Sequence, residues 1–140
     1  MKANNPNFKE RIKKHLEKQE FMHHMGFDLD VIEAGRTEGR MKLEKIHNQQ
    51  TGLVHGGVIA TVADIVAGFA AYTLVGPDEG VVTGELKISY LRAAKGDSLH
   101  AKGWVLKQGR KINFCEAEVY VKNGNEEKLI AKATTSMVIV

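Results

Sequence analysis

The sequence predicts an α+β domain in which a strongly curved antiparallel sheet wraps around one long central helix. Three observations support this prediction. Residues 56–75 form an apolar stretch that contains a single charged residue, Asp64. The sixty residues after it alternate between apolar and polar positions, which is the period of β-strands. Turn-forming sequences separate these strands, so strands joined by such turns are expected to run antiparallel.

Length and composition are those of one globular domain. The chain has 140 residues, of which 43% are hydrophobic and 26% are charged, and this length is sufficient for a real core. The only cysteine, Cys115, excludes an internal disulfide and fits a reducing compartment, so we expect a cytoplasmic protein. Residues 1–20 are polar and charged, which predicts no signal peptide.

The mild positive charge does not indicate a nucleic-acid partner. The formal net charge is +3, and much of it comes from basic residues near the N-terminus: Lys9, Arg11, Lys13, Lys14 and Lys18. A solvated helix face explains this cluster, because neither interleaved aromatic residues nor a nucleic-acid-binding module accompanies it.

The apolar stretch at 56–75 is long enough to span a bilayer, but its composition argues against a membrane span. It contains Asp64, Thr61 and three glycines, and strand-like sequence follows it. A central helix that is buried on most sides explains this pattern better.

The N-terminal segment predicts one short amphipathic helix. Asn5-Pro6 supplies a helix cap followed by a first-turn proline. Apolar residues then recur at helical spacing, at Phe8, Ile12 and Leu16, and the helix is expected to end near His23 or His24. We therefore divide the chain into an N-terminal extension, residues 1–24, and a main domain, residues 25–140.

Two strands and a loop are expected before the long helix. Residues 27–32 alternate in the manner of a strand, and residues 36–43 form a second strand after the Ala34-Gly35 turn. Residues 46–54 are polar and irregular, which predicts a loop. The long helix follows and is expected to end in the turn-forming sequence at 76–80.

Four more strands are expected after the helix. They begin with residues 81–92 and continue with alternating segments at 99–105, 115–121 and 129–139. Turn sequences at 95–97, 108–110 and 123–125 join them. Three hairpin-type connections predict a meander in which each strand pairs with the next.

Asp64 is the residue that most needs an explanation, because a carboxylate in apolar surroundings is costly to ionise. It is either a general base or nucleophile, or a buried acid paired with a lysine or with backbone N–H groups. Gly56 and Gly57 precede it at a helix start, where N–H groups favour negative charge. These glycines either let a ligand approach the backbone or pack the helix end against the sheet. Together the carboxylate and the donors indicate acyl chemistry.

The spacing of these groups predicts a second subunit. Gly56 and Asp64 are eight residues apart, which is about 12 Å along a helix axis. If both act on one carbonyl, the donor and the carboxylate must come from different subunits of a two-fold dimer. His55 is either a general base, because histidine titrates near neutral pH, or a structural residue at the helix start. No residue spacing suggests a metal site.

The run from Gln49 through His55-Gly56-Gly57 to Ala63-Asp64 resembles the hotdog-fold acyl-CoA thioesterases, most closely the PaaI-type branch, which includes 4-hydroxybenzoyl-CoA thioesterase-like members. In that family a histidine-glycine-glycine sequence begins the central helix, and an acid follows nine positions after the histidine. Residues 87–92 and 105–110 also resemble the family's strands, and the resemblance covers about residues 25–140.

The resemblance implies a role for each matching residue. Asp64 matches the acid that activates water or attacks the thioester carbonyl, and Gly56 matches the glycine whose N–H polarises that carbonyl. Gln49, or the adjacent Asn48, matches a position that places substrate or water. Thr83 matches a serine or threonine that helps to hold the water in some members.

Further residues are expected to bind the substrate. Gly57 lies beside the matched donor, and Arg92, Lys107 and Arg110 are weaker candidates for the phosphates of coenzyme A, the alternative being plain solvation. The depth of the acyl pocket is expected to depend on Val58, Val62, Phe69 and Tyr72.

The sequence thus predicts a thioesterase that hydrolyses an acyl-CoA to free acid and coenzyme A. The coenzyme is part of the substrate, and no separate cofactor is expected. The implied assembly is a homodimer with composite sites, and the sequence leaves open whether such dimers pair further into a tetramer. One alternative is a non-catalytic acyl-CoA-binding or sensor protein of the same fold. Another is a structural dimer module in which Asp64 is a satisfied core acid.

Overall fold

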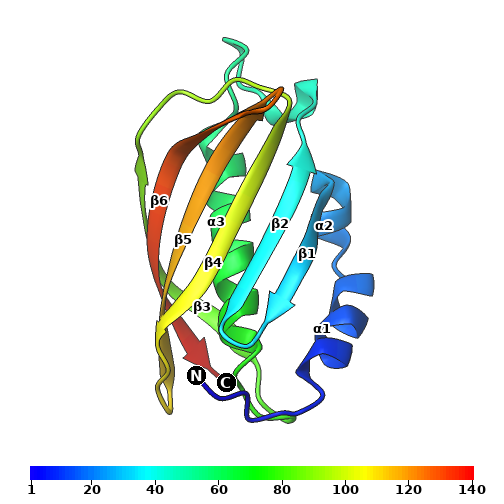
Figure 1. The fold of residues 1–140 in the computed structure, drawn as a ribbon, viewed down its shortest axis with the longest axis vertical. Helices are drawn as coiled ribbons and strands as arrows, with labels where there is room; N and C mark the ends of the chain where they lie inside the picture. Colours follow the sequence, from blue (N-terminus) through cyan, green and yellow to red (C-terminus); the bar gives the residue numbers. More distant parts are fainter.

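One six-stranded antiparallel sheet curves around a single long helix in the computed structural model, which describes residues 1–140 (Figure 1). The elements in chain order are α1 (Phe8–Glu17), α2 (Glu20–Met25), β1 (Phe27–Glu33), β2 (Arg36–Lys42), the 3-10 helix η1 (Lys45–His47), α3 (Gly56–Tyr72), β3 (Val81–Tyr90), β4 (Ser98–Lys107), β5 (Ile112–Asn123) and β6 (Glu126–Ile139). The predicted α+β class and the sheet wrapped around a central helix are confirmed.

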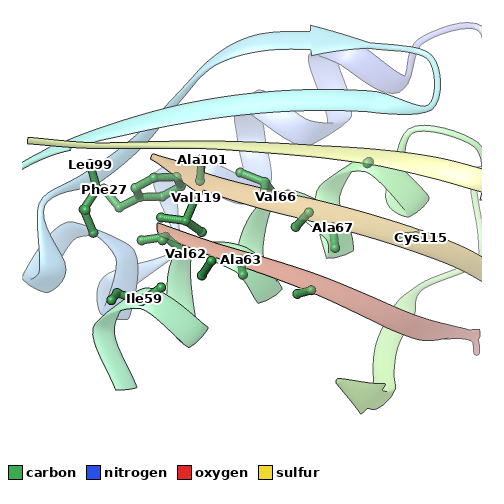
Figure 2. Close-up of a cluster of buried hydrophobic side chains, with 14 of the residues drawn as sticks. Phe27, Ile59, Val62, Ala63, Val66, Ala67, Leu99, Ala101, Cys115 and Val119 are labelled. Carbon is green, nitrogen blue, oxygen red and sulfur yellow. The ribbon is translucent and has the colours of Figure 1, made fainter. Parts of the chain in front are cut away.

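The core lies between α3 and the concave face of the sheet. Figure 2 shows Val62, Val66 and Ala67 of the helix among apolar side chains of the sheet. A Cβ placed on Gly103 of β4 would stand 2.4 Å from the carbonyl carbon of Val66. The helix backbone therefore rests directly on β4, which only a glycine at that position permits.

The predicted meander is wrong at its first connection. The strand order is β1-β2-β4-β5-β6-β3. β3 therefore pairs with β6, and the neighbour of β4 on its other side is β2, where the predicted meander required β3. The segment between β3 and β4 crosses the ends of the two strands between them. Along it the Leu91 N–H donates to the carbonyl of Ile130 on β6, and the Asp97 N–H donates to that of Lys122 on β5. The turn at 95–97 therefore redirects the chain and does not form a hairpin.

The N-terminal segment forms two helices where the sequence predicted one. The apolar spacing stops at Leu16, and α1 ends one residue later. The break lets Ile12 of α1 and Met22 of α2 both be buried. The predicted cap is also displaced: α1 begins at Phe8, and the Asn5 side chain accepts a hydrogen bond from the Asn7 N–H, one turn before the helix.

The long helix ends at Tyr72, three residues earlier than the apolar stretch suggested. Thr73 stops it, because its hydroxyl donates to the carbonyl of Ala70 and accepts from the Gly35 N–H at the β1–β2 turn. The next residues, Leu74 and Val75, are buried without being helical. None of the helices combines the length and the apolar character needed to cross a bilayer.

Candidate active site

The start of α3 offers one free backbone donor. His55 caps the helix: its Nδ1 accepts a hydrogen bond of 2.8 Å from the Gly57 N–H. Val58 and Ile59 donate to the carbonyl of His55. The Gly56 N–H has no acceptor within the chain, so it is the donor at the positive end of the helix dipole that remains available to a ligand.

Two turns further along α3, a threonine on the neighbouring strand holds the carboxylate of Asp64. The hydroxyl of Thr83 on β3 donates to Asp64 Oδ1 at 2.7 Å. No other hydrogen bond or ion pair involves the side chain of Asp64, so Oδ2 is unpaired. The Asp64 carboxylate is therefore not paired with a lysine or with a backbone N–H. Its Oδ2 atom is free to accept a proton or to act as a nucleophile.

Asp64 and Thr83 line a cavity of about 590 Å³, which we call the acid cavity. One face of α3 forms its floor, at Thr61, Asp64, Ile65, Gly68, Phe69 and Tyr72. The opposite wall comes from α1 and α2, and β3 and the end of β6 complete it. Its volume lies within the range of small-molecule sites. Only some of the residues predicted to set the depth of the acyl pocket lie in this cavity. Phe69 and Tyr72 line it, whereas Val62 is buried in the core.

Gly56 lies in a different, smaller hollow of about 350 Å³, the donor cavity, which also contains Gln49, Tyr90 and Arg92. The two cavities share no lining residue. Both lie along β3, which carries Thr83 to the first and Tyr90 to the second. Within one chain the candidate residues therefore form two half-sites, in agreement with the spacing of Gly56 and Asp64 along the helix.

Four predicted binding residues lie outside both half-sites, one of them Gly57, whose N–H already donates to His55 Nδ1. Asn48 pairs with Val54 in an isolated bridge and lines a third hollow. Lys107 is the last residue of β4 and Arg110 lies in the turn after it, near the point where the Val105 N–H donates to the carbonyl of Gly35. This is the end of the molecule at which α3 terminates, opposite Gly56 (Figure 1). Of the three basic candidates, only Arg92 lies in a cavity with Gly56.

Tyr90 is a site residue that the sequence motif did not indicate. Its hydroxyl donates to the carbonyl of Gly56 at 2.8 Å, and its ring covers the glycine at 3.4 Å from an added Cβ. Tyr90 alternates with Leu86 and Ile88 along β3, yet Leu86 and Ile88 are partly buried and Tyr90 is 51% exposed. An aromatic residue at the last position of a strand was the available signal, because the side chain there can turn over the sheet edge.

The N-terminal helices also contribute to the acid cavity, which the sequence motif did not indicate. Arg11, His15 and Tyr72 meet at the end of the cavity that is remote from Gly56. Burial and the positive charges of Arg11 and Lys18 lower the pKa of His15. Burial raises the pKa of Tyr72, against the opposing effect of Arg11. Both groups are therefore uncharged at neutral pH.

Comparisons with known proteins agree with this architecture. Residues 51–128 match the family model described as the thioesterase superfamily. Acyl-coenzyme A thioesterase 13 of Mus musculus is 34% identical over 93 residues, 66% of this chain and 64% of the relative. The medium/long-chain acyl-CoA thioesterase YigI of Escherichia coli is 28% identical over 141 aligned residues, 85% of this chain and 88% of the relative.

A solved structure gives the same result for the fold. A thioesterase family protein from Silicibacter pomeroyi superimposes with a TM-score of 0.93 at 28% sequence identity, covering 95% of this chain and 98% of that chain. The hotdog fold implied by the resemblance is thereby confirmed.

Proposed function

This chain belongs to the thioesterase superfamily, and on that basis we propose that it hydrolyses an acyl-CoA to a free carboxylic acid and coenzyme A. The unpaired oxygen of Asp64, held at the edge of a cavity by Thr83, is the observation that carries the proposal. A carboxylate fixed through one oxygen and free at the other is arranged to take a proton from water or to attack a carbonyl.

The proposed reaction begins with the thioester carbonyl accepting a hydrogen bond from the Gly56 N–H. Asp64 of the facing subunit then removes a proton from water, and the water oxygen attacks the carbonyl carbon. The Gly56 N–H and the helix dipole stabilise the oxyanion of the tetrahedral intermediate. Its collapse breaks the C–S bond, and the leaving thiolate of coenzyme A takes the proton that Asp64 received. Direct attack by Asp64 to form a mixed anhydride is the competing route.

A two-fold dimer would bring the half-sites together. The outer edge of β3 has no partner strand, although β3 is ten residues long. Such an edge readily pairs with another chain. Antiparallel pairing of β3 with its copy would set two α3 helices in opposite directions, so that each Gly56 could approach the other subunit's Asp64. Further pairing of dimers into a tetramer is part of the same proposal.

Other residues would position the substrate around this centre. Gln49 lies in the donor cavity with Gly56, where its amide would orient the thioester or the water. Arg92, an exposed residue that lines the same cavity, is the cation best placed for a phosphate of coenzyme A. His55 would act by fixing the helix start, because its Nδ1 already accepts the Gly57 N–H. Lys107 and Arg110 would reach the substrate only from the partner subunit.

Hydrolysis of a panel of acyl-CoA esters tests the proposal. The panel runs from acetyl to palmitoyl and includes phenylacetyl and hydroxybenzoyl esters. We expect the wild type to release coenzyme A from part of the panel and Asp64→Ala to lose that activity. The alternative, a non-catalytic acyl-CoA-binding protein, predicts a raised melting temperature with the esters but no turnover. An unchanged rate in Asp64→Ala would refute the assigned role of this residue.

A further inference from the structure

The acid cavity changes character along its length. Beside Asp64 it is lined by Ile65 and, further along the helix, by Phe69, which are apolar. It then reaches Tyr72, eight residues and about 12 Å along α3 from Asp64, where side chains of the N-terminal helices meet it. The far end is polar, since Arg11, His15 and Glu79 lie there. An acyl group that starts at Asp64 and follows the helix would end among these side chains.

Arg11 is the positive charge at this far end. Its guanidinium donates to the carbonyls of Gly76, at 2.7 Å, and Glu79, at 2.5 Å, and stacks at 4.5 Å on the ring of Tyr72. These bonds use two of the five N–H donors of an arginine. Arg11 is half-buried and forms no ion pair with a carboxylate. A partly buried, unpaired cation with spare donors favours a negatively charged ligand.

The groups around Arg11 do not neutralise its positive charge. His15 Nε2 lies 3.0 Å from the hydroxyl of Tyr72, and both groups are uncharged at neutral pH. The carboxylate of Glu79 is the one acid at this end, and its Oε2 accepts the Gly76 N–H inside the turn. The far end therefore offers several donors to a ligand that brings its own acceptor oxygens.

We propose that the substrate's acyl group lies along α3 and ends in a carboxylate that Arg11 binds, so that the preferred substrates are monothioesters of medium-chain dicarboxylic acids. This inference rests on the proposed thioesterase function. The apolar middle of the cavity takes the methylene chain, while the guanidinium takes the distal carboxylate as a charge-assisted pair. Arg11 is thus a specificity-determining residue, remote from the bond that breaks.

The test compares two esters of equal chain length, octanoyl-CoA and its ω-carboxylated counterpart suberyl-CoA. Wild type, Arg11→Met and Arg11→Lys are measured with both, and the readout is the ratio of their kcat/KM values. We expect the wild type to prefer suberyl-CoA. Loss of a charge-assisted hydrogen bond predicts that Arg11→Met lowers the ratio by roughly 10–100-fold, chiefly through KM. Arg11→Lys keeps the charge and should restore part of the preference.

Because Arg11 also fastens α1 to the turn at 76–79, a second measurement uses the wild type alone. Free suberate should inhibit hydrolysis competitively and more strongly than octanoate. Lys14→Met is the matched control, since it removes a positive charge from an exposed position of α1 outside the cavity, and it should leave the preference for suberyl-CoA in place.

The outcomes separate this inference from the function on which it rests. If the wild type hydrolyses octanoyl-CoA as well as or better than suberyl-CoA, the inference is wrong and the thioesterase proposal stands. If Arg11→Met and Arg11→Lys slow both esters equally, Arg11 is structural only. If the wild type hydrolyses no ester of the panel, both proposals fail.

Discussion

Thr83 on β3 donates a hydrogen bond of 2.7 Å to Asp64 on α3. This bond joins the central helix to the edge strand in the wall of the acid cavity, and it fixes one carboxylate oxygen while leaving the other free. The orientation of Asp64 thus depends on a strand that has no partner on its outer side. A dimer formed through that strand would also fix the position of the acid.

Removal of the threonine hydroxyl should slow the reaction without unfolding the protein, because Thr83 is exposed. A hydrogen bond to a charged group contributes about 1.5–3 kcal/mol, so we expect Thr83→Val to lower kcat by roughly 10–100-fold. Thr83→Ser keeps the hydroxyl and should stay near the wild-type rate. Steady-state kinetics on the preferred ester measure both. Equal rates for Thr83→Val and the wild type would show that the bond does not serve catalysis.

The free N–H of Gly56 can be removed by proline without an expected break in the helix. Gly56 is the first residue of α3, where proline is tolerated. His55 before it has φ −61° and ψ 134°, the conformation that a following proline requires. We expect Gly56→Pro to lower kcat by about 10²–10³-fold, the usual effect of losing one oxyanion donor.

Gly56→Ala is the matched control, because it keeps the N–H and its Cβ makes ordinary contact with Tyr90 at 3.4 Å. Circular dichroism and melting temperature should be similar for both variants. If Gly56→Ala loses as much activity as Gly56→Pro, space around the glycine matters and the N–H does not.

His55 is expected to act as a helix cap. Asparagine caps helices well, so His55→Asn should keep both the melting temperature and kcat near wild type. His55→Ala removes the acceptor of the Gly57 N–H and should cost about 1 kcal/mol of stability. Thermal melting and kinetics on the same samples distinguish a capping role of His55 from a catalytic one. A large fall in kcat for His55→Asn at an unchanged melting temperature would mean that the imidazole takes part in the chemistry.

The stability of the sheet should depend on pH through Glu38 of β2. Burial raises the pKa of Glu38, but hydrogen bonds from His100 and Arg36 outweigh it and lower the pKa from its ordinary value of 4.5. A group with a lowered pKa in the folded state stabilises the protein above its unfolded pKa, and this stabilisation is lost as the pH falls through the folded value.

Melting temperatures of the wild type and Glu38→Gln between pH 7 and pH 3 test this expectation. The wild type should melt higher at pH 7, and the difference should shrink on acidification, because the protonated carboxyl then resembles the amide. A difference that stays constant over this range would contradict the role of Glu38.

The class of fold could be predicted because its signals are local. The apolar run with one acid at 64 and the alternation after residue 81 follow directly from helix and strand geometry. The strand order could not be predicted in full. The turn at 95–97 has the composition of a hairpin, and only the contacts of the preceding segment with β5 and β6 show that the chain crosses them.

The candidate site was predictable as a set of residues but not as an arrangement. Asp64, Gly56 and Gln49 share a motif, whereas their division between two cavities depends on the course of β3. Arg11 lies outside the motif, and a cluster of basic residues on a short helix gives no sign that one of them turns inwards. Its contact with Tyr72 arises from tertiary packing of α1 against α3.

Complementation between two inactive variants tests most directly the claim that Gly56 and Asp64 act across subunits. Gly56→Pro and Asp64→Ala are each expected to be nearly inactive, and the two are mixed in equal amounts and allowed to exchange subunits. In a mixed dimer, one site combines both defects and the other combines an intact Gly56 with an intact Asp64. Random exchange makes half of the dimers mixed, so activity should rise to about a quarter of wild type. Activity that stays at the level of the separate variants, despite proven exchange, would contradict a site shared between subunits.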